Sequence, residues 1–395
     1  MPTTRELFLQ YQAQTSDAPM GINCVKAEGV KIYDDKGKEY IDLIAGIGVS
    51  NVGHCHPKVV KAVQKQAEQY MHLMVYGEYI QSPQALLAEK ITSLLDHSLN
   101  NVYFVNSGSE AVEGALKLAK RHTGKRKIVS CINAYHGSTH GALSVMGNEF
   151  FKQNFRPLLP EVYHINQGQL DEINVIDEDT AAIIIEPVGA EIGVNPMSSE
   201  YFKALQKRCR EVGALLIFDE VQTGFGRCGS MFYHQALDVV PDILVLAKGM
   251  GGGMPIGAFI ANEKIMKDLS HDPVLGHITT FGGHPVSCAA SLACINVILE
   301  EKLVDIVAVK NQLFQSLLKH KAIKDFRSVG LMIAIEFESQ AFNFSVIRKC
   351  IDKGVLTDWF LFNDSSLRIA PPLTISEQEI RQACAAILEA IEETC

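Results

Sequence analysis

The chain has 395 residues, of which 47% are hydrophobic and 21% are charged, and this balance excludes an intrinsically disordered protein. At roughly 150 residues per domain, the length predicts two to three domains with a core that needs no disulfide or metal. Acidic residues outnumber basic ones by 45 to 36, and the densest basic run, 120–127, is short. A nucleic-acid or membrane-surface partner is therefore not expected.

The N-terminus and the cysteines indicate the compartment. Residues 1–12 contain Arg5 and Glu6 and lack the apolar run of a secretory signal. The ten cysteines include no CxxC pair, and several lie inside apolar runs, as expected for reduced core cysteines. We therefore predict a cytoplasmic protein without structural disulfides.

Taken in chain order, the predicted elements begin with a hairpin. Residues 30–43 alternate apolar and polar side chains around Asp35-Lys36-Gly37, the pattern of two antiparallel strands joined by a turn. Further along, apolar runs without alternation favour strands that are covered on both faces, and helical patterns lie between them. This alternation predicts a mostly parallel sheet between helices, with strands at 102–105, 127–132, 181–185, 214–218 and 242–247 and helices at 110–122 and 200–211.

The C-terminal third has a different pattern. The stretch 273–299 has no charged residue but is interrupted by Gly282-Gly283-His284-Pro285, so it predicts a buried helix and not a membrane span. After it, helices are predicted at 301–320 and 376–393 and a strand at 332–337. We predict a large α/β domain over 51–295 and a smaller α+β domain formed by 1–50 and 296–395.

Ligands of open parallel sheets bind at the carboxyl ends of the strands, so the residues that follow each apolar run are informative. After 102–105, Ser107 and Glu110 have the spacing of a capping box that opens a helix. The backbone amides of Gly108 and Ser109 would then form an anion site suited to a phosphate. A well-capped helix without a ligand is an equally good interpretation of this motif alone.

Two further strand ends carry charged residues, since Asp219 follows 214–218 and Lys248 follows 242–247. A desolvated lysine has a lowered pKa, and its free amine can attack a carbonyl. An adjacent acid can pair with the protonated pyridine nitrogen that pyridoxal phosphate requires. A lysine that simply reaches water is the alternative for Lys248 alone, but the three strand ends together favour a pyridoxal phosphate site.

A set of short motifs extends this interpretation over nearly the whole chain. They are 46–57, 106–110, 135–137, 185–187, 218–227, 247–248, 251–257, 279–283 and 367–368. With these motifs in this order, the chain resembles the class III, pyridoxal-phosphate-dependent aminotransferases of fold type I. Within them it is most similar to the acetylornithine and ornithine aminotransferase group.

The resemblance implies an α/β fold of the fold type I transferases, with a seven-stranded, mostly parallel sheet in the large domain and a small domain built from both termini. It also implies a ping-pong transfer of the amino group of an ω-amino donor, acetylornithine- or ornithine-like, to 2-oxoglutarate. Lys248 would carry the internal aldimine and then move a proton on the substrate. Asp219 would hold the pyridinium.

The remaining site residues are implied in the same way. Val221 and Tyr135 would enclose the ring, Gln222 would reach its phenolic oxygen, and Thr280 of the other subunit would join the phosphate site, which makes the protein a homodimer. The full expected cofactor set is Ser107, Gly108, Ser109, Tyr135, His136, Glu186, Asp219, Val221, Gln222, Lys248 and Thr280. No metal is expected.

Four residues are expected to bind substrate: Arg368, Glu191, Ser138 and Thr279. Arg368 resembles the arginine that holds the α-carboxylate of glutamate or 2-oxoglutarate, since a guanidinium fits a carboxylate bidentately. Glu191 resembles the glutamate that masks this arginine while the donor binds.

The sequence departs from the group after Gly137, where Ser138 stands in place of the usual arginine for the donor's distal carboxylate. A buried charged hydrogen bond contributes roughly 1.5–3 kcal/mol, so its loss changes donor specificity. A diamine, 4-aminobutyrate or β-alanine type of donor is therefore the alternative to an acetylornithine-like one.

Three other interpretations are weaker. The GxGxxG match at 224–229 does not follow a strand directly or open a helix, as a dinucleotide site requires. His54-Cys55-His56 are adjacent residues without further ligands, and a turn fits them better than a metal site. A non-catalytic binding protein of the same fold is expected to lack Lys248 or Asp219, and both are present.

Overall fold

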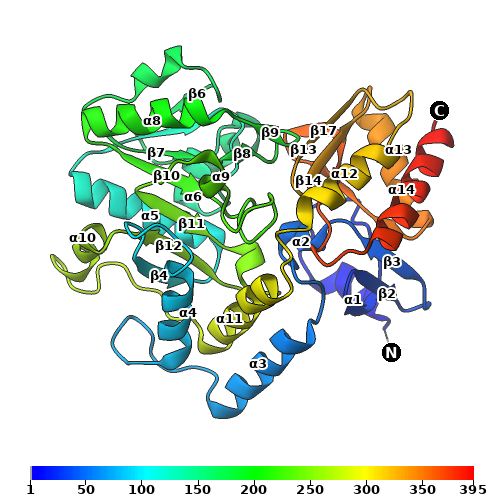
Figure 1. Cartoon of the computed structure of the whole chain (residues 1–395), viewed down its shortest axis with the longest axis horizontal. Helices are drawn as coiled ribbons and strands as arrows, with labels where there is room; N and C mark the ends of the chain where they lie inside the picture. Colours follow the sequence, from blue (N-terminus) through cyan, green and yellow to red (C-terminus); the bar gives the residue numbers. More distant parts are fainter. Residues whose placement is uncertain (1) are drawn as a thin grey trace.

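The structure is a computed structural model that describes residues 2–395. Its largest sheet has seven strands in the order β4-β12-β11-β10-β7-β5-β6 and lies in the left half of Figure 1. The strands pair in parallel except β12, which is antiparallel to both neighbours. Their bounds are Asn101–Val105 (β4), Lys127–Cys131 (β5), Val162–Ile165 (β6), Thr180–Ile185 (β7), Leu215–Asp219 (β10), Ile243–Leu246 (β11) and Gly257–Ala261 (β12).

All five predicted strands of the large sheet are present, and the apolar runs lack alternation because both faces of the sheet are covered. On β10, Leu216 and Phe218 belong to one hydrophobic core and Leu215 and Ile217 to another. The first core includes residues of α8 (Ser199–Val212), and the second includes residues of α5 (Gly108–Thr123). Since successive side chains of a strand point to opposite faces, each face needs its own apolar set.

The charge-free stretch forms a buried helix, as predicted. This helix, α11 (Pro285–Glu300), begins at the proline, which suits the first turn because it has no N–H to satisfy. It packs against α3 (Pro57–Gln69) and α4 (Ser82–Thr92). Among residues 2–395, no helix is long and apolar enough to cross a membrane.

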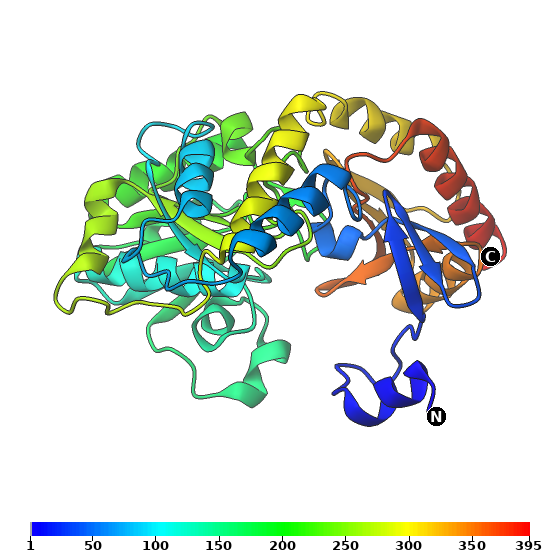
Figure 2. The same ribbon diagram turned by 90° about the horizontal axis from the view of Figure 1, so that it is seen from below.

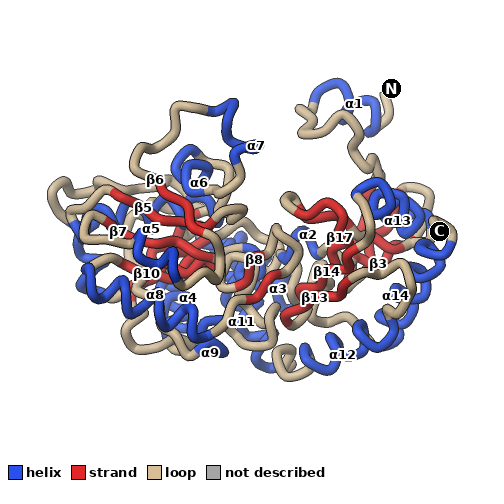
Figure 3. Tube along the Cα trace, turned by 90° about the horizontal axis from the view of Figure 1, so that it is seen from above, coloured by secondary structure: helices blue, strands red, loops and turns tan. Residues whose placement is uncertain are grey.

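Two smaller sheets form the right half of Figure 1 and combine the two ends of the chain. One has the order β1-β2-β3-β15, in which the predicted hairpin supplies β2 and β3 and the C-terminal part supplies β15; the other has the order β13-β14-β17-β16. Figure 3 shows these strands (red) bordered by α12, α13 and α14. The bounds are Cys24–Glu28 (β1), Lys31–Asp34 (β2), Glu39–Asp42 (β3), Asp325–Val329 (β13), Met332–Glu336 (β14), Val355–Leu356 (β15), Asp358–Phe360 (β16), Asn363–Ile369 (β17), Val307–Leu317 (α12), Gln340–Asp352 (α13) and Glu377–Glu392 (α14).

The α/β class and the large sheet are confirmed, while the domain boundaries at residues 50 and 295 stay predictions. The helix predicted at 301–320 is too long, because residues 301–306 form turns and Lys302 has a positive φ of 50°. Strands β6 and β12 were not predicted: β6 is a half-exposed edge strand, and β12 is a buried run of five residues behind a glycine-rich loop.

The remaining elements are short, apart from an N-terminal helix that stands away from the rest of the molecule in Figure 2. No residue of this helix, α1, is buried. The bounds are Thr4–Tyr11 (α1), Ala45–Gly48 (α2), His140–Val145 (α6), Glu149–Lys152 (α7), Val188–Gly189 (β8), Asn195–Pro196 (β9), Tyr233–Leu237 (α9) and Glu263–Met266 (α10).

Candidate active site

The strand ends that the sequence singled out meet at one cavity of about 390 Å³. Asp219 is the last residue of β10 and pairs in register with Val245 of the neighbouring β11, so Lys248 follows only three residues further on. The turn into α5 completes the wall. Ten of the eleven predicted cofactor residues line this cavity, all except Thr280: Ser107, Gly108, Ser109, Tyr135, His136, Glu186, Asp219, Val221, Gln222 and Lys248.

Lys248 lies at the floor of this cavity, at the point where β11 ends. Its φ is +47°, in the sparsely populated left-handed region, which turns the chain sharply after the strand. Burial lowers the pKa of its amine to about 8, although Glu191, Asp219 and Glu186 favour the charged form. About one tenth of the amine is therefore uncharged at pH 7, far more than for an exposed lysine, and this fraction is able to act as a nucleophile or base.

Asp219 is held by a histidine and by the backbone. Its Oδ2 lies 2.8 Å from Nδ1 of His136, and its Oδ1 accepts a hydrogen bond from the amide of Val221 at 3.0 Å. Because a carboxylate only accepts, Nδ1 of His136 carries the proton. Both side chains are buried, so the carboxylate is fixed in orientation.

Glu186 lies beside Asp219 without a cation of its own. Its Oε2 accepts a hydrogen bond from the amide of Tyr135 at 3.1 Å. Burial, with a smaller contribution from the charge of Asp219, raises the pKa of Glu186 well above its usual range. Burial therefore favours the protonated form of Glu186, and a protonated acid can donate a hydrogen bond to a ligand.

The entry to α5 is built for close approach of a ligand. The Ser107 side chain caps the helix by accepting a hydrogen bond from the amide of Glu110 at 3.2 Å, but the reciprocal half of the predicted capping box is shifted by one residue, since Glu110 accepts from the amide of Asn106. A Cβ at Gly108 would lie 3.1 Å from the Val221 methyl groups, and one at Gly137 would lie 2.1 Å from Oγ of Ser109. The amides at the N-terminus of this 16-residue helix thus stay open to an anion.

Arg368 and Glu191 form a buried ion pair next to the cavity. The guanidinium donates to both carboxylate oxygens, at 3.1 Å and 2.6 Å. Burial alone would raise the pKa of Glu191, but the charge and hydrogen bonds of Arg368, with smaller contributions from the Leu361 amide and Lys248, together outweigh it and the pKa is lowered. Gln222, which lines the cavity, donates to Glu191 at 3.1 Å and so connects the pair to the floor of the site.

A second carboxylate at Arg368 was missed by the sequence analysis. Asp358 of β16 pairs directly with Arg368 of β17 in the antiparallel register. Its Oδ1 lies 3.2 Å from Nε of Arg368, and its side chain is 13% exposed. No motif includes Asp358, and only the pairing of β16 with β17, which was not predicted, brings it to the arginine.

The other predicted site residues lie outside the cavity. Ser138 is exposed at its rim, where its Oγ lies 3.2 Å from the hydroxyl of Tyr135. Thr279 accepts a hydrogen bond from Nδ2 of Asn106 at 2.9 Å but faces a separate, larger hollow. Thr280 is exposed beside it, so within one chain it does not reach the cavity.

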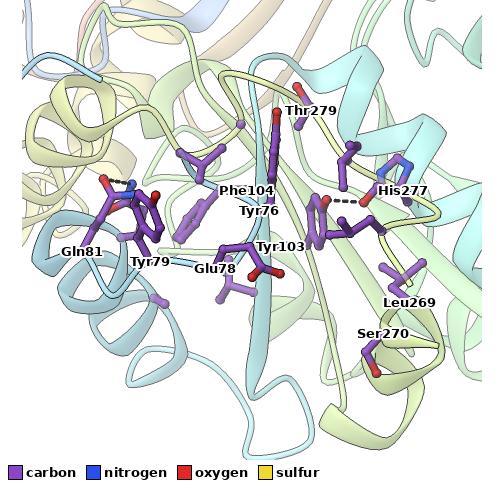
Figure 4. A pocket seen from close by; sticks show the side chains of 18 of the residues that line it. Tyr76, Glu78, Tyr79, Gln81, Tyr103, Phe104, Leu269, Ser270, His277 and Thr279 are labelled. Carbon is purple, nitrogen blue, oxygen red and sulfur yellow. Dashed lines mark hydrogen bonds between the residues drawn. The ribbon is translucent and has the colours of Figure 1, made fainter. Parts of the chain in front are cut away.

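This larger hollow, of about 680 Å³, contains none of the predicted catalytic residues. Figure 4 shows Tyr76, Tyr103 and Phe104 on its walls, with the Tyr103 hydroxyl bonded to the backbone oxygen of His277. It is an aromatic depression on the surface of the part of the molecule that contains the seven-stranded sheet. Its rim includes Val274, Leu275 and the fully exposed Ile80.

The smaller cavity fits the cofactor that the resemblance implies. Lys248 offers an amine of lowered pKa, Asp219 offers a fixed carboxylate, and the entry of α5 offers amides for a phosphate. The Nε2 atom of His136 is buried and has no hydrogen-bond partner within residues 2–395. Pyridoxal phosphate needs these three kinds of group: an amine, an acid for its ring nitrogen and a phosphate site.

Comparison with known proteins agrees with this geometry. A family model described as "Aminotransferase class-III" matches residues 11–391. The chain is 39% identical to acetylornithine aminotransferase from Methanopyrus kandleri, covering 98% of each chain. It is also 39% identical to putrescine aminotransferase from Pectobacterium atrosepticum, covering 97% of this chain and 84% of that protein.

A solved structure is similar over almost the whole length. The ornithine aminotransferase from Toxoplasma gondii, described with partial occupancy of PLP at its active site, superimposes with a TM-score of 0.90 at 30% identity. The alignment covers 98% of this chain and 93% of that one.

Proposed function

The chain belongs to the class III aminotransferases, which depend on pyridoxal phosphate, and we propose that it moves the amino group of an ω-amino donor to 2-oxoglutarate. The donor in this proposal is acetylornithine- or ornithine-like, and the two substrates bind in turn in a ping-pong cycle. The observation that carries the proposal is the buried pair of Arg368 and Glu191, tied by Gln222 to the wall of the cavity that holds Lys248.

When bound, the cofactor supplies an aldehyde that takes up the amino group and a ring that withdraws electrons from the substrate carbon. The residues of the chain set up this chemistry. Lys248, whose amine is half uncharged near pH 8, would take the proton from the substrate carbon that bears the amino group and return it as general acid. Asp219, oriented by His136, is the residue that would pair with the protonated ring nitrogen of the cofactor.

Arg368 and Glu191 allow one site to accept two kinds of substrate. With Glu191 in place, both ends of the guanidinium are occupied and a donor without a carboxylate at this position binds. When Glu191 moves aside, the same fork is free for the carboxylate of 2-oxoglutarate. A lysine could not make this bidentate exchange, because its charge is a single point.

A second candidate function differs only in the donor. Ser138 offers a hydroxyl to the distal end of the donor, and no cation except Lys248 lines the cavity in residues 2–395. A donor with a distal carboxylate would therefore lack a partner there. This observation favours a diamine, 4-aminobutyrate or β-alanine type of donor, and one relative acts on a diamine by its name, putrescine aminotransferase.

A screen of half-reactions separates the two candidates. Purified protein in its yellow form would be mixed with ornithine, acetylornithine, 4-aminobutyrate, putrescine, lysine or β-alanine while its visible absorption is followed. Bleaching by the ornithine pair alone would support the first candidate, and bleaching by putrescine or the ω-amino acids would support the second. A protein that no donor bleaches, but that still binds pyridoxal phosphate, would contradict both.

A homodimer is part of the proposal. The larger hollow is lined by several exposed apolar side chains, among them Tyr79, Ile80, Val274, Leu275 and Ile278. An exposed patch of this kind marks an interaction surface, and a second copy seated on it would bring exposed Thr280 to its partner's phosphate site. Analytical ultracentrifugation should give a dimer, and Ile80→Asp with Val274→Asp should give a monomer of low activity.

We also infer a cytoplasmic location. All ten cysteines are free, and seven of them are buried. Burial raises the pKa of the Cys131 and Cys288 thiols far above their usual range, so these groups are inert core residues of the kind found in reducing compartments.

A further inference from the structure

The guanidinium of Arg368 uses three of its five N–H donors in hydrogen bonds within the chain. Nη1 and Nη2 each donate to Glu191, and Nη2 also donates to the backbone oxygen of Trp359 at 3.0 Å. The ring of Phe360 packs on its face, 4.5 Å from Cζ. One N–H of Nη1 and the Nε edge are left, and the Nε edge faces Asp358.

Asp358 meets this edge through charge and not through a well-formed hydrogen bond. The Nε and Oδ1 atoms are 3.2 Å apart, yet their geometry is poor, and neither atom has another partner among the described residues. Asp358 cannot turn away easily, because it lies opposite Arg368 in the β16–β17 ladder. The side chain of Arg368 is only 6% exposed, so the attraction is weakly screened.

The charges around Arg368 determine how Asp358 affects an incoming carboxylate. The cluster of Arg368, Glu191 and ionised Asp358 contains one positive and two negative charges. Glu191 must leave the guanidinium before a substrate carboxylate can replace it, but Glu191 remains nearby. The exchange therefore adds a third negative charge to a buried region, and the fixed charge of Asp358 opposes it.

We propose that Asp358 is a specificity-determining residue that acts through Arg368: its negative charge weakens the binding of the acceptor's carboxylate. This inference rests on the proposed function, because it takes Arg368 as the acceptor site. Asp358 does not touch the substrate in this scheme. It sets how much of the positive charge of Arg368 an acceptor can use.

The same geometry makes acceptor binding depend on pH. The charged groups that face Asp358 are Arg368 on β17, Glu191 beyond β8 and Asp42 on β3. Burial raises the pKa of Asp358 to about 6, reinforced by Glu191 and Asp42 and opposed by Arg368. Asp358 is therefore neutral below pH 6 and ionised above it, so the affinity for the acceptor should fall as the pH rises through 6.

The test measures binding of 2-oxoglutarate to the holoenzyme by titration calorimetry. In the form whose cofactor carries no amino group, the enzyme binds this oxo acid without turnover. The variant Asp358→Asn keeps the shape and removes the charge, and we expect its Kd at pH 8 to be about fivefold below that of the wild type. At pH 5.5 the two proteins should differ little, because wild-type Asp358 is then mostly neutral.

Asp364→Asn is the matched control, since Asp364 lies on the same strand as Arg368 but is exposed and bonds Gln340. Its Kd should equal that of the wild type at both pH values. Wild-type protein alone provides a second test, because its Kd should rise between pH 5.5 and 7. A pH-independent wild-type Kd, or an Asp358→Asn Kd at pH 8 equal to or above that of the wild type, would overturn the inference.

Arg368→Ala separates this inference from the proposed function on which it rests. If Arg368→Ala loses the binding of 2-oxoglutarate while Asp358→Asn leaves it unchanged, the acceptor site stands and the role of Asp358 is refuted. If Arg368→Ala binds 2-oxoglutarate as well as the wild type does, the proposed acceptor site itself is wrong.

Discussion

Asp219 ends one strand of the large sheet and Lys248 follows the neighbouring strand, whereas Arg368 lies on a small sheet and Glu191 follows a strand of another. Lys248 and Asp219 form what we call the cofactor end of the site, and the β10–β11 register fixes the distance between these two residues. Arg368 and Glu191 form the carboxylate end, where a substrate carboxylate would bind. Arg368 lies on β17 of a small sheet, and Glu191 follows the short strand β8 of another. These two residues are held together by their ion pair and by the hydrogen bond from Gln222 to Glu191.

The different placement of the two pairs of residues suits their different roles, which are to hold the cofactor and to exchange two substrates. Groups that hold a cofactor must stay in place through the whole cycle, and adjacent buried strands cannot separate without unfolding. A site that takes a donor in one half-reaction and an acceptor in the other needs a contact that opens. An ion pair between separate sheets can open at the cost of a few hydrogen bonds.

The cofactor end should be the more sensitive to mutation, and Lys248→Ala is expected to give the largest effect. It removes the nucleophile and the proton carrier together, so kcat should fall by about 10³-fold or more in both half-reactions. Single-turnover absorbance measurements test this. Borohydride should leave a pyridoxyl group on the wild-type peptide containing Lys248 and none on the variant, and a variant with normal turnover would contradict the role of Lys248.

The apo chain should capture its cofactor in a pH-dependent way. Because the pKa of the Lys248 amine is lowered to about 8, the uncharged nucleophile is lost as the pH falls below that value. The rate of pyridoxal phosphate capture should therefore drop about tenfold per pH unit below 8, and it should level off above it. Stopped-flow absorbance gives this profile, and a midpoint near 10.5 would mean that the amine is not desolvated.

Arg368→Lys should slow the acceptor half-reaction but not the donor half-reaction, which would separate the role of Arg368 from that of the cofactor end. The variant keeps the charge but loses the bidentate fork, so the KM for 2-oxoglutarate should rise about 10- to 100-fold. The rate of the donor half-reaction should change little, because a donor without a carboxylate at this position does not use the fork. Equal losses in both half-reactions would place Arg368 at the cofactor end instead.

The sequence predicted the cofactor end better than the carboxylate end for the same physical reason. Lys248 and Asp219 follow unalternating apolar runs, and in a parallel sheet such ends must lie at one edge. Ser107 was found through local capping chemistry. All three were therefore visible before the chain was folded.

Asp358 could not be found in this way, because its partner is ten residues away across an unpredicted hairpin. Strand β6 was missed because a half-exposed run carries a weak pattern, and β12 was missed because its five residues directly follow a glycine-rich loop. The pair of Arg368 and Glu191 was expected only from the resemblance, since nothing local in the sequence links residues so distant in the chain. Contacts between sheets depend on tertiary packing, and local patterns do not report it.

Ser138→Arg probes the rim of the site and should have a moderate effect. Ser138 is exposed and contacts Tyr135, so a guanidinium there would meet the distal end of the donor in partly hydrated surroundings. The KM for acetylornithine should fall about three- to tenfold, and the KM for putrescine should rise. Thr139→Arg places the same charge one residue further on and serves as the control; identical effects at both positions would indicate general electrostatics.

The smallest expected change lies outside both ends, in the helix that closes the chain. Ser376 caps α14: its hydroxyl accepts from the amide of Glu379 at 3.3 Å, and Glu379 accepts from the amide of Ser376 at 2.8 Å. Ser376→Ala should cost about 1 kcal/mol of stability, a decrease of about 1–2 °C in Tm for a chain of this size. Ser316→Ala, in an exposed position inside α12, is the control and should leave Tm nearly unchanged. Because α14 packs mainly against α12, α13 and β15, kcat and both KM values should stay the same. A change in the KM for 2-oxoglutarate alone would show that the small sheets transmit the change at α14 to Arg368.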